Sequence, residues 1–214
     1  MAVPDFDRLY LDTTVLRKTN WPRISVELAT LLELARNFGI DVVIPEPVES
    51  EREEQWVRDF GEASQKYLTA SKKRSLFLGA IGVDVAEGLA DRLDELRSRY
   101  REVAQAVIKQ NGIKTASITT RAVGHFLKLA ITRTPPFQIS GDKVTGFQDT
   151  AILLSILDDM QNCGKETCAV LSDDGVFSKV DAVCSTEGKT IRHLRSVEEF
   201  WKTLGSEIEP PYIT

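Results

Sequence analysis

Acidic side chains recur along this chain at the points where apolar runs predict the ends of strands. They are Asp12 after residues 9–11, Glu51 after residues 42–45, Asp149 at the start of an apolar helix, and Asp173 and Asp174 after residues 169–172. In an open α/β sheet the carboxyl ends of the strands border one crevice, where ligands bind. Several carboxylates in one crevice repel each other and cannot all stay ionised unaided. A divalent cation is the simplest remedy, so the pattern predicts metal-assisted chemistry.

The apolar periodicity predicts an α/β fold with a mostly parallel central sheet. Residues 9–11 and 41–44 are predicted strands joined by a helix that Gly39 ends, which gives a right-handed β-α-β unit. A mostly helical segment at about 53–132 is expected as an insertion. A Pro/Gly-rich loop at 134–146 precedes the helix that carries Asp149, and residues 169–171 and 190–192 are further predicted strands.

Composition indicates one domain spanning residues 1–214. The chain is 42% hydrophobic, which suffices for one sizeable core, and no stretch has the composition of a linker. The first residues lack the basic and apolar run of a signal peptide, and no apolar stretch is long enough to cross a bilayer. We therefore expect a cytoplasmic protein without a membrane partner.

Charge is divided unevenly along the sequence. The net charge is −5, yet the segment from Arg58 to Arg133 holds 14 Lys and Arg against 8 Asp and Glu, while the remainder holds 13 against 24. An acidic core beside a basic segment suits an enzyme that binds cations in its site and phosphates next to it. A solvated helical surface would give the same pattern.

Two motifs near the start resemble those of PIN-domain nucleases. Residues 11–16, Leu-Asp-Thr-Thr-Val-Leu, resemble the family's opening motif, in which Asp-Thr-Asn-Val-Leu is usual, so only Thr14 departs. Residues 45–51 resemble the second motif, where an acidic residue stands about two turns past the strand. Spacing assigns that role to Glu51, with Glu49 and Glu46 as alternatives.

Two further motifs follow in the order of that family. Residues 146–153, Gly-Phe-Gln-Asp-Thr-Ala-Ile-Leu, resemble the third motif, in which an Asp begins an apolar helix. Residues 172–177, Ser-Asp-Asp-Gly-Val-Phe, resemble the fourth, which places the family's acid at Asp174 and leaves Asp173 as an extra carboxylate. The motifs cover roughly 9–51 and 134–177 and leave the helical middle unmatched.

The resemblance implies a PIN-like three-layer fold and a metal-dependent nuclease. Asp12, Asp149 and Asp174, with Glu51 in support, would hold one or two Mg²⁺ or Mn²⁺ ions that activate a water for in-line attack on a phosphodiester, and Asp173 is an additional candidate ligand. The family favours RNA over DNA as substrate. Relatives also suggest an antitoxin or other regulatory protein as partner, a role in phage defence, and homodimers.

Substrate contacts are predicted from the basic residues and from hydroxyls beside the acids. The candidates are Lys143 on the loop before Asp149, Arg99 and Arg101 in the basic middle with Tyr100 available for stacking, and Thr13 and Ser172 as hydroxyl partners of carboxylates or water. Thr14 in place of asparagine removes an amide, so weaker activity or a changed metal preference is expected.

Other functional hypotheses require different catalytic residues or no catalysis. A haloacid-dehalogenase-like phosphatase needs Asp-x-Asp, and Thr14 occupies the third position, so its general acid is missing. The two histidines, His125 and His193, are predicted to be structural. A PIN-like module that binds RNA or a protein without cutting is the main alternative, because a fold does not guarantee activity.

Overall fold

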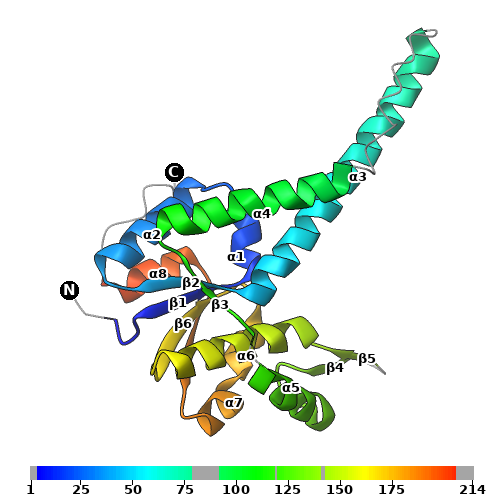
Figure 1. The fold of residues 1–214 in the computed structure, drawn as a ribbon. Coiled ribbons are helices and arrows are strands. Elements are labelled where there is room, and N and C mark those ends of the chain that lie inside the picture. Colours follow the sequence, from blue (N-terminus) through cyan, green and yellow to red (C-terminus); the bar gives the residue numbers. More distant parts are fainter. Residues whose placement is uncertain (1–3, 79–91, 119, 141–142, 206–214) are drawn as a thin grey trace.

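The computed structural model describes residues 4–78, 92–118, 120–140 and 143–205. Helices cover both faces of a five-stranded sheet, and a two-stranded hairpin lies beside it (Figure 1). The elements are β1 (Arg8–Leu11), α1 (Thr13–Lys18), α2 (Val26–Asn37), β2 (Asp41–Pro45), α3 (Glu46–Leu78), α4 (Arg92–Asn111), β3 (Lys114–Ala116), α5 (Thr120–Thr132), β4 (Gln138–Ser140), β5 (Lys143–Thr145), α6 (Phe147–Asn162), β6 (Thr167–Leu171), the 3₁₀ turn η1 (Gly175–Lys179), α7 (Asp181–Thr186), β7 (Thr190–Leu194) and α8 (Val197–Thr203).

The central sheet is entirely parallel, with strand order β3-β2-β1-β6-β7. All four residues of β1 are buried, as expected for a strand covered on both faces. Leu9 aligns with Val42 of β2 on one side and with Ala169 of β6 on the other. The chain builds outward from β1 to β3 and then returns to place β6 on the other side of β1. The switch point of the topology therefore lies between β1 and β6, where such sheets bind ligands.

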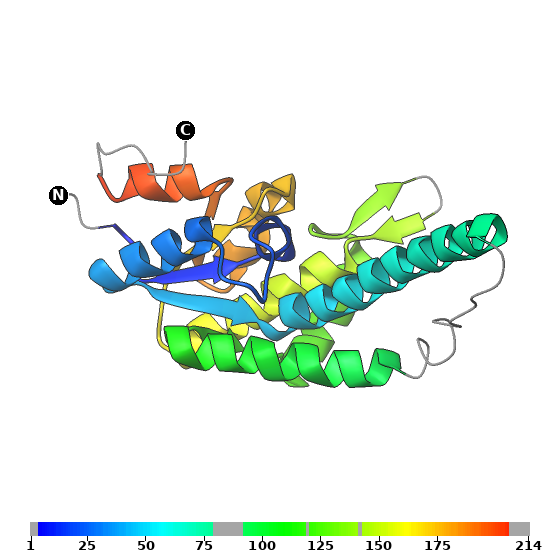
Figure 2. The same cartoon turned by 90° about the horizontal axis from the view of Figure 1, so that it is seen from above.

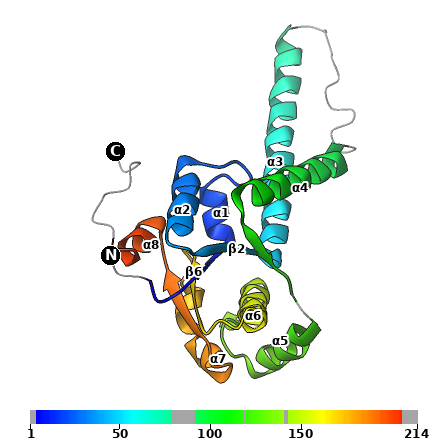
Figure 3. The same cartoon turned by 60° about the vertical axis from the view of Figure 1, so that its left-hand side comes forward.

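Three layers result from this connectivity. Helices α2 and α4 lie over one face of the sheet and α6 and α7 over the other, with α5 beside α6 (Figures 1 and 3). The β4-β5 hairpin extends away from the central sheet at the start of α6 (Figures 1 and 2). Among the described residues, no helix has the length and apolar character needed to span a bilayer.

The predicted fold class is confirmed: the protein is α/β with a parallel sheet between helical layers. One local expectation was wrong: the Pro/Gly-rich segment before Asp149, predicted as a loop, contains the antiparallel strands β4 and β5. The segment predicted to be mostly helical contains α3, α4 and α5, but it also contributes a short strand, β3, which pairs with β2 at the edge of the sheet. Each of these strands has three residues, too few for a period-2 pattern to be recognised.

The two long helices of the middle segment pack as an antiparallel pair. Their contact is stabilised by two bidentate ion pairs between the helices, Arg97 with Glu54 and Arg101 with Glu53. Tyr100, expected to be available for base stacking, is 3% exposed and packs against the Trp56 ring. The expectation was wrong because the helix turns this ring inward. The distal part of α3 projects away from the sheet (Figure 1).

Candidate functional site

Four carboxylates from distant parts of the sequence lie at the carboxyl ends of the central strands. Asp12 follows β1, Asp174 follows β6, Glu51 lies in the second turn of α3 after β2, and Asp149 lies in the first turn of α6. The pKa of Asp149 is raised to about 6, first by burial and then by the negative charges of Asp174, Asp12 and Glu51. The four side chains are thus close enough to form one electrostatic unit.

Hydrogen bonds fix the orientation of the Asp12 side chain. Its side chain is 5% exposed. Its Oδ2 atom accepts hydrogen bonds from Thr14 Oγ1 at 2.8 Å, from Ser172 Oγ at 2.7 Å and from the Thr14 backbone N–H at 3.4 Å. The hydrogen bonds described for this carboxylate all converge on Oδ2. The geometry therefore leaves Oδ1 as the oxygen that can face a cation.

Thr14 stands where the related motif usually has asparagine, and its hydroxyl takes part in the site. Thr14 Oγ1 donates to Asp12 and accepts a hydrogen bond of 3.1 Å from the Asp173 backbone N–H. A threonine hydroxyl can donate and accept at once, so it connects the ends of β1 and β6. The sequence indicated only a missing amide at this position, whereas the structure shows a hydroxyl that orients the acid.

The first turns of α3 separate the glutamates that spacing alone left as alternatives. Glu51 accepts hydrogen bonds from Thr13 Oγ1 at 2.7 Å and from Gln55 Nε2 at 3.0 Å, and its charge acts on Asp149. Glu49 instead accepts from Gln105 of α4. Glu46 is exposed in the first turn of the helix. Residues 49 and 51 are about 200° apart around the helix, so they face opposite directions.

The two adjacent aspartates after β6 also point differently. Asp174 caps η1 through a 3.0 Å hydrogen bond that its Oδ1 accepts from the Val176 N–H, and its charge raises the pKa of Asp149. Asp173 is exposed and pairs with Lys18 at 2.7 Å. The hydrogen bond from Lys18 lowers the pKa of Asp173. Asp174 therefore belongs to the electrostatic group around Asp149, whereas Asp173 forms an ion pair with the Lys18 side chain.

Asp149 is positioned by a tight backbone contact at the start of α6. Gly146, the residue before this helix, has φ of +92°, and a Cβ there would clash with the backbone carbonyl oxygen of Pro136. No side chain caps this helix end. An Asp in a first helical turn is commonly a capping group, but here the carboxylate faces the other acids.

The donor set fits a hard divalent cation. It consists of carboxylate oxygens, the ligands that Mg²⁺ and Mn²⁺ prefer. Burial and the negative charges of the other three acids raise the pKa of Asp149, so a cation would stabilise its ionised form. Across the described ranges, no three Asp, Glu, His or Cys side chains are gathered tightly enough to hold an ion as they stand. Mutual repulsion favours this spread arrangement. Ion binding would thus draw the carboxylates together.

Of the residues predicted to contact the substrate, the two hydroxyls bond to the acids, whereas Arg99 and Arg101 lie on α4. Thr13 and Ser172 donate to Glu51 and Asp12, so their hydroxyls orient carboxylates. Arg101 is bound to Glu53, whereas Arg99 is exposed on α4. Lys143 lies in β5, and its side chain is outside the described residues.

Sequence reasoning missed two residues of the site, Gln55 and Lys18. Gln55 stands four residues after Glu51, a spacing that places both on one helix face, so it could have been found once the helix was assigned. Lys18 pairs with Asp173 across 155 positions. No local signal in the sequence reveals such a contact.

Ser172 and His193 connect the site to the edge of the sheet. The Ser172 hydroxyl accepts a hydrogen bond of 3.0 Å from the Asp174 backbone N–H while donating to Asp12. A ring nitrogen of His193 lies 2.8 Å from the Ser172 carbonyl oxygen. The histidine thus supports the backbone turn that presents Asp174, in line with the structural role expected of it.

Comparison of the sequence with protein families gives a match that spans this site. The family model described as PIN domain matches residues 9–177, which is most of the chain and includes all four acids. Comparison with curated proteins and with solved structures gives no significant match.

Proposed function

The chain belongs to the PIN-domain family, and on that premise we propose that it is a Mg²⁺- or Mn²⁺-dependent endonuclease that hydrolyses phosphodiester bonds, with RNA as its substrate. The single observation that carries the proposal is the electrostatic state of Asp149. A carboxyl group whose pKa is raised to about 6 by burial and by three neighbouring carboxylates would be stabilised in its ionised form by a bound cation. Perturbed carboxylates at the switch point of a parallel sheet are typical of an active site.

Each acid has a distinct part in this proposal. Asp12, fixed through Oδ2 by Thr14 and Ser172, presents Oδ1 as the most rigid ligand. Asp149 and Asp174 would complete the ligand set, and a hydrogen bond from Thr13 orients Glu51. When bound, the ion would supply a water of lowered pKa and charge stabilisation at the phosphodiester. No protein nucleophile is required.

The preference for RNA rests on the family, as do the proposed roles in toxin-antitoxin or phage-defence systems with a regulatory protein partner. A homodimer is likewise a proposal from the family. The structure supports a partner surface only indirectly, through apolar side chains that α5 exposes at four-residue spacing: Val123, Leu127 and Ile131.

Cleavage of labelled single-stranded RNA and of matched DNA, each with Mg²⁺, Mn²⁺ or EDTA, tests the proposal. The decisive variant is Asp149→Asn. The matched control is Asp181→Asn, because Asp181 is also a first-turn aspartate but lies on α7, outside the four acids. We expect metal-dependent RNA cleavage by the wild type and by the control, and a loss of at least about 100-fold in Asp149→Asn.

Contaminating nuclease would show itself as equal cutting by all three proteins purified in the same way. RNA binding without metal-dependent cutting would overturn the proposed activity and favour a non-catalytic RNA-binding module. Faster cutting of DNA than of RNA would overturn the substrate assignment alone.

A further inference from the structure

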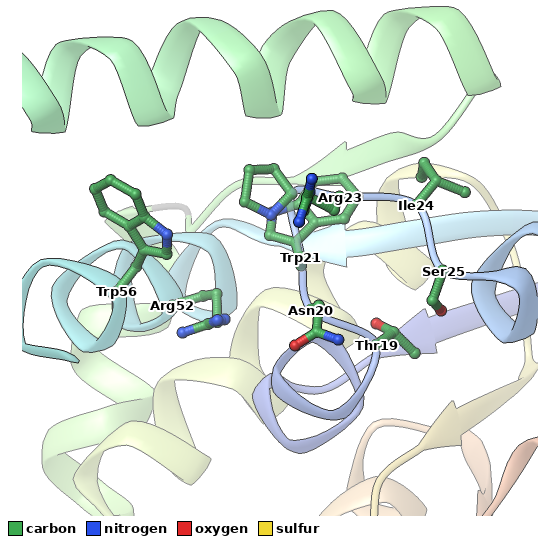
Figure 4. Close-up of a pocket in the computed structure, with 9 residues that line it drawn as sticks. Thr19, Asn20, Trp21, Arg23, Ile24, Ser25, Arg52 and Trp56 are labelled. Atoms are coloured by element: carbon green, nitrogen blue, oxygen red, sulfur yellow. The ribbon is translucent and has the colours of Figure 1, made fainter. Parts of the chain in front are cut away.

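A cavity lies beside the first turns of α3, the helix that carries Glu51. It has a volume of about 700 Å³ and lies between the segment 19–25, which follows α1, and the first turns of α3 (Figure 4). We call it the Arg52 pocket, after the arginine that lines it together with Asn20, Arg23, Ser25 and Trp56. Its volume is within the range of about 300–1,000 Å³ that is usual for sites of small ligands.

Arg52 is a buried cation whose hydrogen-bonding capacity is unused. The residue is 6% exposed, and its Nε and Nη1 atoms are buried without a hydrogen-bond partner among the described residues. Its one described ion pair is long, with Nη1 4.0 Å from Asp59 Oδ2, and the Asp59 side chain is largely exposed. A buried guanidinium without hydrogen bonds is costly, and an anion that accepts from it removes that cost.

The lining of the pocket favours an anion over a cation. Two arginines, Arg23 and Arg52, line it, and none of its lining residues is a carboxylate. Asn20 adds an exposed amide, and its φ of +59° is a left-handed conformation that asparagine tolerates better than most residues. The Arg52 fork matches the geometry of phosphate oxygens.

An aromatic ring forms another wall of the pocket. Trp56 lies one helical turn after Arg52 and is half-buried. Its ring stacks on Phe60 with centroids 5.9 Å apart and packs against Tyr100 at 5.4 Å, so two other rings fix its orientation. An indole held in this way offers a preformed surface on which a nucleobase can stack.

The pocket and the acids are connected through α3 and through the segment that contains α1. Arg52 directly follows Glu51 on α3, and the segment 19–25 directly follows α1, whose first residue is Thr13. The 2.7 Å hydrogen bond from Thr13 to Glu51 joins these two elements. A strand that places one phosphodiester at the acids would therefore bring a neighbouring nucleotide to the Arg52 pocket.

We propose that the Arg52 pocket binds one nucleotide of the substrate strand, with the Arg52 guanidinium on its phosphate and the Trp56 ring stacked on its base. This inference rests on the proposed nuclease function for the identity of the ligand. It assigns to the site a positioning contact that fixes the register of the strand relative to the acids.

Binding measurements without catalysis test the pocket. The variants are Arg52→Met, Arg52→Lys and Trp56→Leu, with Arg58→Met as control, because Arg58 is an exposed arginine of the same helix that does not line the pocket. Kd is measured in EDTA for a labelled single-stranded RNA, and separately for adenosine 5′-monophosphate and adenosine. Thermal midpoints are recorded for every variant.

For Arg52→Met we expect Kd for both RNA and the monophosphate to rise about tenfold or more, since a charge-assisted pair is lost. Binding of adenosine, which lacks the phosphate, should be weak and insensitive to Arg52, while Trp56→Leu should weaken all three ligands. The thermal midpoint of Arg52→Met should not fall, because the buried Nε and Nη1 atoms have no described hydrogen bond to lose and the ion pair with Asp59 is long. If Arg52→Met unfolds the protein, Arg52→Lys provides the test, with weaker phosphate binding expected from loss of the planar fork.

Failure of the pocket and failure of the nuclease proposal give different results. If folded Arg52 variants still cut RNA and their Kd values for RNA and the monophosphate are unchanged, nucleotide binding by the Arg52 pocket is overturned. The proposed nuclease activity is then unaffected. Binding of monophosphate that depends on Arg52 in a protein that never cuts would support the pocket as a nucleotide site and overturn the nuclease function. A fall in thermal midpoint with no change in Kd would show that Arg52 is structural.

Discussion

The hydroxyl of Thr14 lies 2.8 Å from Asp12 Oδ2 and simultaneously accepts the backbone N–H of Asp173 at 3.1 Å. These two contacts join the carboxyl ends of β1 and β6, the strands that flank the switch point of the sheet. Thr14, which replaces the asparagine usual in this motif, thus still supplies a hydrogen-bond donor to Asp12. It also links that acid to the turn that presents Asp174.

Replacing Thr14 by valine should therefore impair the site without changing its shape. Loss of the hydroxyl leaves Asp12 less well oriented, and such supporting contacts are worth about 10–100-fold in metal affinity or activity. Thr14→Ser keeps the hydroxyl and should stay close to the wild type. Isothermal titration with Mn²⁺ and the rate of RNA cleavage measure the effect. Thr30→Val, which removes a hydroxyl bonded within α2, is the control.

Asp149 makes folding stability depend on pH in a defined direction. Its pKa in the folded protein, about 6, lies above the ordinary value of 3.8, so the folded state retains this proton up to a higher pH than the unfolded chain does. The resulting contribution to stability is complete below about pH 4 and is lost as the pH rises through about 6. Without metal, Asp149→Asn should consequently gain stability over the wild type at pH 7.5.

We expect that gain to be on the order of 1 kcal/mol at pH 7.5, after allowance for the partial exposure of the group, and to shrink towards pH 4.5. Thermal unfolding in EDTA at both pH values measures it. Added Mn²⁺ should reverse the order at pH 7.5, because a cation stabilises the wild type more than the variant. An equal difference between the two proteins at both pH values would contradict the raised pKa.

Glu51 and Glu49 should respond differently to the same substitution. Glu51→Gln removes a charge that acts on Asp149 and weakens the acceptor for Thr13, so cleavage should slow by about tenfold and the pKa of Asp149 should fall. Glu49→Gln alters a residue that faces Gln105 of α4 and should leave the cleavage rate within about twofold. The pH dependence of the rate reports both effects. A larger loss in Glu49→Gln would reassign the second acid.

Gly146 should not tolerate a side chain. An alanine there would be strained at φ of +92°, and its Cβ would clash with the Pro136 carbonyl oxygen. We expect Gly146→Ala to cost about 2 kcal/mol of stability and to reduce cleavage, because the contact sets the start of the helix that carries Asp149. Gly124→Ala provides the contrast, since Gly124 lies inside α5 with open space around its Cβ position and should gain slightly in stability. Denaturant unfolding of both variants measures the difference.

Much of the fold was readable because long buried strands and amphipathic helices have strong local patterns. The runs at β1, β2 and β6 predicted a parallel sheet, and strand ends in such a sheet must meet, so the convergence of distant acids could be anticipated. The three-residue strands β3, β4 and β5 could not be read, because their pairing depends on neighbours that the local sequence does not specify.

The sequence by itself determined the family, the parallel α/β architecture and the presence of acids at its strand ends, since these follow from periodicity and motif order along the chain. The tertiary structure alone decided which side chains face one another. The rotation of α3 turns Glu51 towards Thr13 and Glu49 towards Gln105, and packing leaves Arg52 buried without a hydrogen-bond partner among the described residues. Contacts between these side chains depend on the rotation of each helix about its axis and on long-range packing, which residue order does not reveal.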